Sequence, residues 1–164
     1  MSQCLARLWR YAMVLSHKRD VADDLVQSTC VRALERCAQV KESAGVDRWL
    51  FSILHSVWVN ELRAQHVRQG QGFVDVDDVD DLDEPAETFT FEDRHWHTQV
   101  MQRVKRLPEA QRNAVFLVYV EGFTYQEAAM TLSVPIGTIM SRLASARLTL
   151  AKNTGTSSRQ GEKK

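Results

Sequence analysis

Apolar residues in the first part of the chain recur at helical spacing. The pattern predicts a helix over residues 5–15, a second helix that begins after Asp20, and a third over residues 47–66. The apolar positions of the second helix follow the i, i+3, i+4, i+7 spacing of one buried face. We predict Asp20 as the N-cap of this helix, because short acidic side chains accept hydrogen bonds from exposed first-turn amides.

A second group of helices is predicted in the C-terminal part of the chain. The pattern indicates a short helix over residues 96–106 and a second that begins at Pro108 and runs through Val120. The second contains the run VFLVYV and is expected to be buried nearly all round, and Gly122 is expected to end it. Neither group shows the alternation of a strand, so we predict an all-α protein of two small helical domains.

The strongest local signal is a predicted helix-turn-helix. Thr124 and Glu127 form a capping box before a short helix that ends at Leu132, and Pro135 ends the turn that follows. The last helix is expected over residues 136–152, with a buried stripe of Ile139, Leu143, Ala146 and Leu150. Its other side carries Thr138, Ser141, Arg142, Ser145 and Thr149. Small hydroxyls with an arginine suit the major groove of DNA, although a plain surface helix shows the same pattern.

Charge separates the two helical groups. The chain carries 21 basic and 21 acidic residues, yet residues 70–99 hold ten acidic residues and one basic residue. Like charges repel, so this segment is expected to be an extended, solvated linker; the alternative is an acidic segment that covers a basic surface. We therefore predict helical domains over residues 1–67 and 96–152, an acidic flexible linker over 68–95, and a disordered tail over 153–164.

Composition excludes several classes of protein. A hydrophobic content of 44% and three cysteines in 164 residues exclude a disordered chain and a disulfide scaffold, and indicate a reducing compartment. Cys30 and Cys37 are expected to be small buried residues rather than a redox pair. No stretch is long enough to span a membrane, and Arg7 and Arg10 exclude a secretory signal, so a cytoplasmic protein is expected. The chain lacks a phosphate loop, a metal-ligand cluster and a nucleophile motif, so we expect neither an enzyme nor a cofactor or metal.

The C-terminal segment resembles region 4 of bacterial sigma factors of the extracytoplasmic-function type. The resemblance is carried by Leu107, Pro108, Arg112, Gly122, Tyr125, Glu127, Ala129, Gly137, Thr138, Ser141, Arg142, Leu143, Ala146 and Arg147. The N-terminal segment resembles region 2 of the same family. There the sequence DVADDLVQ at residues 20–27 is similar to its acid-rich helix, and WLFSI at residues 49–53, with Asn60 and Arg63, is similar to its promoter-reading helix.

The resemblance implies an alternative sigma factor that joins core RNA polymerase, recognises promoter DNA and initiates transcription of a stress- or signal-responsive regulon. Its partners would be the polymerase, double-stranded promoter DNA, the opened non-template strand and an anti-sigma factor. The polymerase contacts it implies are Asp23, Asp24 and Gln27. The two acids have an alternative role, since they compensate the helix dipole by about 0.3–1 kcal/mol each.

The resemblance also implies the DNA contacts. The minus-ten contacts would be Val40 and Lys41, in a loop that captures a flipped base, and Ser56, Asn60 and Arg63 on one helix face. The minus-thirty-five element would be read by Thr138, Ser141, Arg142 and Ser145. Phosphate contacts, which position the protein without specifying sequence, would be Arg112, Gln126 and Arg147.

Two other functions compete with this interpretation. One is a sigma-like decoy that sequesters an anti-sigma factor without reading promoters. It is favoured by the scarcity of basic residues after Arg63, and by Met140, where relatives often have Lys or Arg. Such decoys usually carry a receiver domain, for which this chain is expected to have no room. The other is a helix-turn-helix repressor, which leaves the N-terminal resemblance unexplained.

Overall fold

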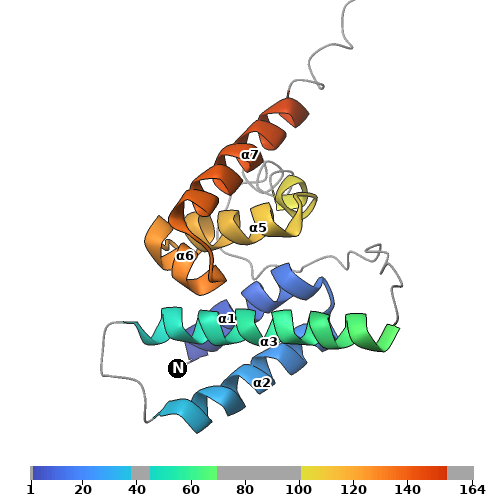
Figure 1. Ribbon diagram of the computed structural model, residues 1–164, viewed down its shortest axis with the longest axis vertical. Helices are drawn as coiled ribbons and strands as arrows, with labels where there is room; N and C mark the ends of the chain where they lie inside the picture. The colour runs from blue at the N-terminus through green and yellow to red at the C-terminus, as the bar shows by residue number, and fades with distance from the viewer. Residues whose placement is uncertain (1, 38–44, 70–100, 155–164) are drawn as a thin grey trace, which may run out of the picture. The chain divides into compact units, whose positions relative to one another are not determined.

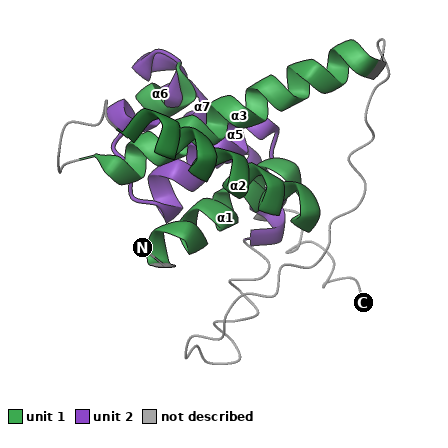
Figure 2. Cartoon of the chain, turned by 90° about the horizontal axis from the view of Figure 1, so that it is seen from below, with its two compact units in different colours: residues 1–81, 129–133 green, residues 82–128, 134–164 purple. Residues whose placement is uncertain are grey.

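The computed structural model describes residues 2–37, 45–69 and 101–154, and all regular secondary structure in these ranges is helical. The chain divides into two compact units. Unit 1 comprises Met1–Asp81 with Ala129–Ser133, and unit 2 comprises Leu82–Ala128 with Val134–Lys164 (Figure 2). The helical prediction is confirmed for the described ranges. The predicted acidic linker and polar tail lie outside them, except at their first two residues.

Three helices form the N-terminal part of unit 1: α1 (Ser2–Ser16), α2 (Arg19–Arg36) and α3 (Val46–Gln69). Each packs against the other two, and they lie side by side in Figure 1. Their packing buries one apolar stripe of each helix, which is how amphipathic helices gain most of their stability. The fully buried side chains include Leu8, Tyr11, Ala12, Ala22, Thr29, Phe51 and Leu54.

Helices α1 and α3 are joined by a row of polar and aromatic contacts. Arg7 Nη1 lies 2.5 Å from Asp47 Oδ2, and the Arg7 guanidinium lies 5.6 Å from the centre of the Phe51 ring. One turn further on, the Tyr11 ring stacks on Phe51 with centroids 5.3 Å apart. The Tyr11 hydroxyl lies 3.3 Å from His55 Nδ1. These contacts hold α3 against α1 in one orientation. They thereby determine which side of α3 is exposed.

Cys4 lies at the start of the same row, where its thiol donates to Asp47 Oδ1 at 3.5 Å. Burial raises the pKa of the Cys4 thiol, and the Asp47 carboxylate raises this pKa further. In a Cys30→Ser, Cys37→Ser variant, we therefore expect alkylation of Cys4 by iodoacetamide to follow a pH profile displaced to higher pH than that of a small thiol. Adding Asp47→Asn removes the negative charge and shifts the profile to lower pH. A profile that Asp47→Asn does not move contradicts this assignment.

The start of α2 differs from the prediction. The N-cap is Lys18, which forms no side-chain capping bond, and Asp20 lies inside the first turn of the helix. The tight turn between α1 and α2 is the reason. His17 adopts a left-handed conformation (φ 56°), and the Ser16 hydroxyl accepts a hydrogen bond from the Lys18 amide. The turn therefore starts the helix one residue before Asp20.

The burial of the two cysteines at the end of α2 also differs in part from the prediction. Cys30 is half-buried, but Cys37 is exposed at the end of the helix, and both are free thiols. The expectation that both are buried is therefore wrong for Cys37. The apolar spacing of α2 continues to Cys37, whereas the residues that are buried in this helix end at Thr29.

The C-terminal helices are α5 (Glu109–Val115), a π-helix η2 (Phe116–Val120), α6 (Tyr125–Leu132) and α7 (Ile136–Thr154), preceded by a short helical stretch at 101–105. Helix α5 packs on α7. Gly122 adopts φ 71° after η2, which confirms it as the end of the helical segment. The expectation that residues 108–120 are buried nearly all round is wrong at both ends, because residues 108–110 are exposed and Tyr119 and Val120 are 55% and 49% exposed.

The predicted capping box of α6 is present. The Thr124 amide donates to Glu127 Oε2 at 2.8 Å, and the Glu127 amide donates to Thr124 Oγ1 at 3.2 Å. Thr124→Ala should lower the free energy of unfolding by about 1 kcal/mol, because the amide of Glu127 loses its acceptor. Urea unfolding followed by circular dichroism measures this loss. Thr124→Ser keeps the hydroxyl and is the control; equal losses in both variants would contradict the role of the cap.

The turn and last helix also follow the prediction. Ser133 adopts a left-handed conformation (φ 54°) at the end of α6, and the Pro135 carbonyl accepts from the Thr138 amide at 3.0 Å. Three of the four predicted stripe residues of α7, Ile139, Leu143 and Ala146, are fully buried, whereas Leu150 is half-buried. The stripe therefore fixes which side of α7 faces outward.

Candidate nucleic-acid and partner interfaces

The outward side of α7 carries the four residues predicted to read bases. Ser141 and Ser145 are exposed, and Thr138 and Arg142 are half-buried beside them. The Ser141 hydroxyl donates to the Thr138 carbonyl at 3.0 Å, and its oxygen keeps the capacity to accept hydrogen bonds. Short side chains of this kind let a helix approach base edges closely. The structure therefore gathers the four on one accessible surface.

Two of the three predicted phosphate contacts are also accessible. Gln126 is exposed in the first turn of α6, at the end of a helix where backbone amides favour anions. Arg147 is exposed on α7, and its Nη1 donates to the Tyr119 hydroxyl at 3.1 Å. This bond holds the guanidinium at the side of α7 that is next to η2. Sequence reasoning missed Tyr119, because the run VFLVYV reads as buried throughout.

Arg112 is the exception. It is only 8% exposed, and its Nη1 donates to the carbonyls of Lys105 and Leu107 at 3.2 and 3.0 Å. Burial lowers the pKa of Arg112 below its ordinary value, and Glu109 opposes the shift. This geometry contradicts the expectation that Arg112 contacts phosphate. The side chain instead satisfies backbone carbonyls at the end of the 101–105 helical stretch.

Helix α3 presents the predicted strand-contacting residues together. Ser56, Asn60 and Arg63 are spaced four and three residues apart, and all three are exposed. The other two residues predicted for this role, Val40 and Lys41, lie outside the described residues. Within the described chain, the three α3 side chains can supply a hydroxyl, an amide and a cation to a single nucleic-acid strand.

Helix α2 presents the predicted polymerase contacts, and the structure distinguishes between the two acids. Asp23, Asp24 and Gln27 are all exposed. Asp23 Oδ1 accepts a hydrogen bond from Trp9 Nε1 at 2.7 Å, and the Arg19 guanidinium lies 5.8 Å from the centre of the Trp9 ring. Asp23 therefore contributes to the packing of α1 on α2. Of these two predicted acids, Asp24 is therefore the better candidate for contact with an external partner.

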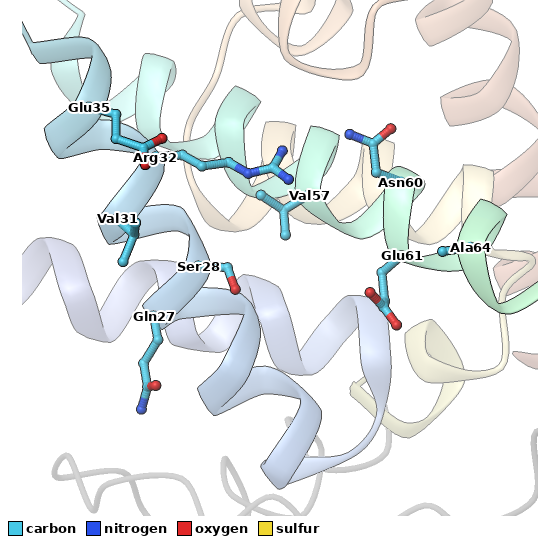
Figure 3. A pocket seen from close by; sticks show the side chains of 9 residues that line it. All are labelled: Gln27, Ser28, Val31, Arg32, Glu35, Val57, Asn60, Glu61 and Ala64. Carbon is cyan, nitrogen blue, oxygen red and sulfur yellow. The ribbon is translucent and has the colours of Figure 1, made fainter.

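A groove of about 630 Å³ separates the later turns of α2 and α3 (Figure 3). Its lining includes Gln27, a predicted polymerase contact, and Asn60, a predicted DNA contact. Arg32 extends from α2 toward α3 across it (Figure 3). The remaining lining residues are Ser28, Val31, Glu35, Val57, Glu61 and Ala64. The groove shows that the two predicted surfaces adjoin, which the sequence alone did not reveal.

The described residues contain neither a candidate membrane-spanning helix nor a candidate metal site. No helix in the described ranges has the length and apolar character to cross a membrane. No cluster of three or more histidine, cysteine or acidic side chains that could hold a metal ion occurs in the same ranges.

Each half of the chain matches a known protein family. Residues 97–150 match the family described as Sigma-70, region 4, and residues 1–55 match the Sigma2 domain of PhyR. The ECF RNA polymerase sigma factor EcfG of Rhodopseudomonas palustris is 31% identical over 147 residues, covering 86% of this chain and 75% of the relative. SigM of Mycobacterium tuberculosis is 30% identical over 149 residues, covering 91% and 72%.

Solved structures show the same fold. The sigma factor RpoE of Bartonella quintana, in complex with the anti-sigma factor NepR, superposes with a TM-score of 0.73 at 28% identity, covering 92% of this chain and 91% of that one. CnrH, in complex with the cytosolic domain of CnrY, has a TM-score of 0.61 at 20% identity and covers 96% and 86%. At that identity, the likeness to CnrH shows the fold alone.

A capped helix-turn-helix with an exposed hydroxyl face, joined in one chain to a three-helix unit, is typical of a DNA-binding transcription factor. The relatives then give the family: the chain belongs to the ECF RNA polymerase sigma factors. It is an alternative sigma factor, which binds core RNA polymerase, recognises promoter DNA and initiates transcription. Its relatives are transcription regulators.

Proposed function

We propose that the two halves of the chain divide the work of promoter recognition. Residues 1–67 bind core polymerase and the minus-ten element, residues 96–152 read the minus-thirty-five element, and residues 68–95 connect them. The observation that carries this proposal is the two-sided character of α7, where a fully buried stripe fixes an exposed face of short hydroxyl side chains. Such a face suits the major groove of duplex DNA.

Within residues 1–67, Asp24 and Gln27 of α2 contact the polymerase, and Asp23 supports them through its bond to Trp9. Ser56, Asn60 and Arg63 of α3 contact the opened non-template strand. The adjoining groove supports this division, because Gln27 and Asn60 line it from opposite helices (Figure 3). Val40 and Lys41 remain predicted contacts of a flipped base.

Within residues 96–152, Thr138, Ser141, Arg142 and Ser145 read base edges, and Gln126 and Arg147 contact phosphates. Gln126 sits in the first turn of α6, and the first helix of a helix-turn-helix crosses the DNA backbone. Arg147 is held by Tyr119 on the flank of α7, which suits a contact that positions the helix.

We also propose an anti-sigma factor as a regulatory partner and the cytoplasm as the location. The support is that two structural relatives were solved with anti-sigma factors, RpoE with NepR and CnrH with CnrY. The regulon would then respond to a stress or signal that releases the factor. No described helix is suited to span a membrane. The partner would therefore bind this chain without insertion of the described helices into a membrane.

One observation favours a second candidate function. Residues 1–55 match the Sigma2 domain of PhyR, and PhyR is an anti-anti-sigma factor in its complex with NepR. That PhyR structure is 13% identical and shares the fold alone, with this chain covering 46% of it. A decoy of this kind would bind an anti-sigma factor and initiate no transcription.

In vitro transcription with core polymerase, the purified protein and a promoter library tests the proposed function. We expect transcripts from templates that share a two-block motif, with Arg142→Ala weakening selection of the upstream block alone. Binding to an anti-sigma factor with no transcript from any template would favour the decoy. DNA binding without polymerase binding would favour the repressor.

A further inference from the structure

The first turns of α7 expose an uncharged surface. Its large exposed side chains are Ile136, which is 40% exposed at the first position of the helix, and Met140, which is 49% exposed three residues before the fully buried Leu143. Around Met140, the other exposed positions are small or hydroxylic: Gly137, Ser141, Ala144 and Ser145. A Cβ built on Gly137 meets no atom within 4 Å, so the surface beside Met140 is open.

The nearby cations are placed differently. Arg142 is half-buried on the opposite flank of the helix from Met140, and Arg147 donates to Tyr119. Met140 precedes Ser141, a predicted base contact, and is followed one turn later by the short Ala144. A helix that brings Ser141 to the base edges therefore brings the Met140 thioether to the same groove, with little side-chain bulk to hold it away.

We propose that Met140 is a specificity-determining residue that reads the C5-methyl group of a thymine in the upstream promoter element. The inference rests on the proposed function of α7. The thymine methyl is the apolar group on the major-groove edge of the base pairs. A methionine side chain is unbranched and polarisable, so it can adapt to such a group, and it has no donor for the N7 and O6 acceptors of guanine.

The test replaces thymine by uracil, which removes this methyl and nothing else. Core polymerase with the full-length protein first selects upstream blocks from a library of promoters. Each thymine of the selected block is then replaced in turn by deoxyuridine, and holoenzyme affinity is measured. We expect one position at which uracil weakens binding about fourfold, the value of one buried methyl-sized group.

Variants assign that position to Met140. Met140→Ala should abolish the preference for thymine over uracil there and leave the other positions unchanged. Met140→Arg should shift the preference at that position to guanine, because arginine pairs with its two acceptors. Met130→Ala is the matched control, since Met130 is 70% exposed on α6, outside the recognition helix. It should leave the thymine preference unchanged.

The outcomes separate this inference from the proposed function. If transcripts start from two-block promoters but no thymine-to-uracil replacement matters, the role of Met140 is overturned and the proposed function stands. The same holds if Met140→Ala keeps the discrimination, or if Met130→Ala removes it. If no template gives a transcript, the proposed function fails, and the assignment of Met140 fails with it.

Discussion

Asp24→Lys should lower transcription by core polymerase about 30-fold or more, through weaker binding of the sigma factor to the enzyme. Asp24 is exposed on α2, on the surface that we propose to contact the polymerase. Reversing a charge at an interface costs about 2 kcal/mol or more, which corresponds to this loss. The dissociation constant for core polymerase, measured with fluorescently labelled protein, checks the result.

Asp20→Lys is the matched control, because Asp20 lies one turn earlier on the same helix and has the same charge and exposure. Asp20 lies in the first turn of α2, where an acid compensates the helix dipole, whereas Asp24 lies beyond that turn and in the proposed contact. We expect Asp20→Lys to change polymerase affinity less than threefold. Equal losses in the two variants would show that the acids act through helix stability, and would remove Asp24 from the interface.

Phe51→Ala should lower the free energy of unfolding by about 3–5 kcal/mol, the usual cost of deleting a buried aromatic ring. Phe51 is 0% exposed, stacks on Tyr11 and lies beneath the Arg7 guanidinium, so its loss opens a cavity between α1 and α3. A domain of this size has a total stability of about 5–15 kcal/mol, so the variant is close to unfolding. Urea unfolding followed by circular dichroism measures the change.

Two variants separate the ring from its surroundings. Tyr11→Phe keeps the stack on Phe51 and removes the hydroxyl near His55, so we expect a loss of about 0.5–1.5 kcal/mol. Leu34→Ala removes an apolar side chain that is exposed on α2, and should cost less than about 0.5 kcal/mol. A Phe51→Ala loss no larger than that of Leu34→Ala would contradict the central position of the ring.

The helix-turn-helix could be predicted closely from sequence because its signals are local. The capping box at Thr124 and Glu127 involves atoms three residues apart, and the stripe of Ile139, Leu143 and Ala146 follows from helical spacing alone. The structure extends the last helix by two residues beyond the prediction, to Thr154. Helix ends depend on weak terminal bonds, so they are the least certain part of any such pattern.

The errors fall where a contact outside the helical pattern decides the outcome. Arg112 is expected to contact phosphate, but its side chain donates hydrogen bonds to the carbonyls of Lys105 and Leu107. Asp20 reads as an N-cap, but the Ser16 hydroxyl and the turn at His17 start the helix earlier. Tyr119 reads as core, but it lies exposed in the π-helix η2 and accepts from Arg147.

The sequence by itself determined the helical class, the order of most helices, the capped turn and the family, because periodicity, caps and motifs are properties of neighbouring residues. Only the tertiary structure decided which polar side chains remain available. It committed Asp23 to Trp9 and Arg112 to backbone carbonyls, and it left Asp24, Asn60 and Met140 exposed. A polar group that folding brings away from water must find a partner, and that partner is set by packing between elements rather than by helical periodicity.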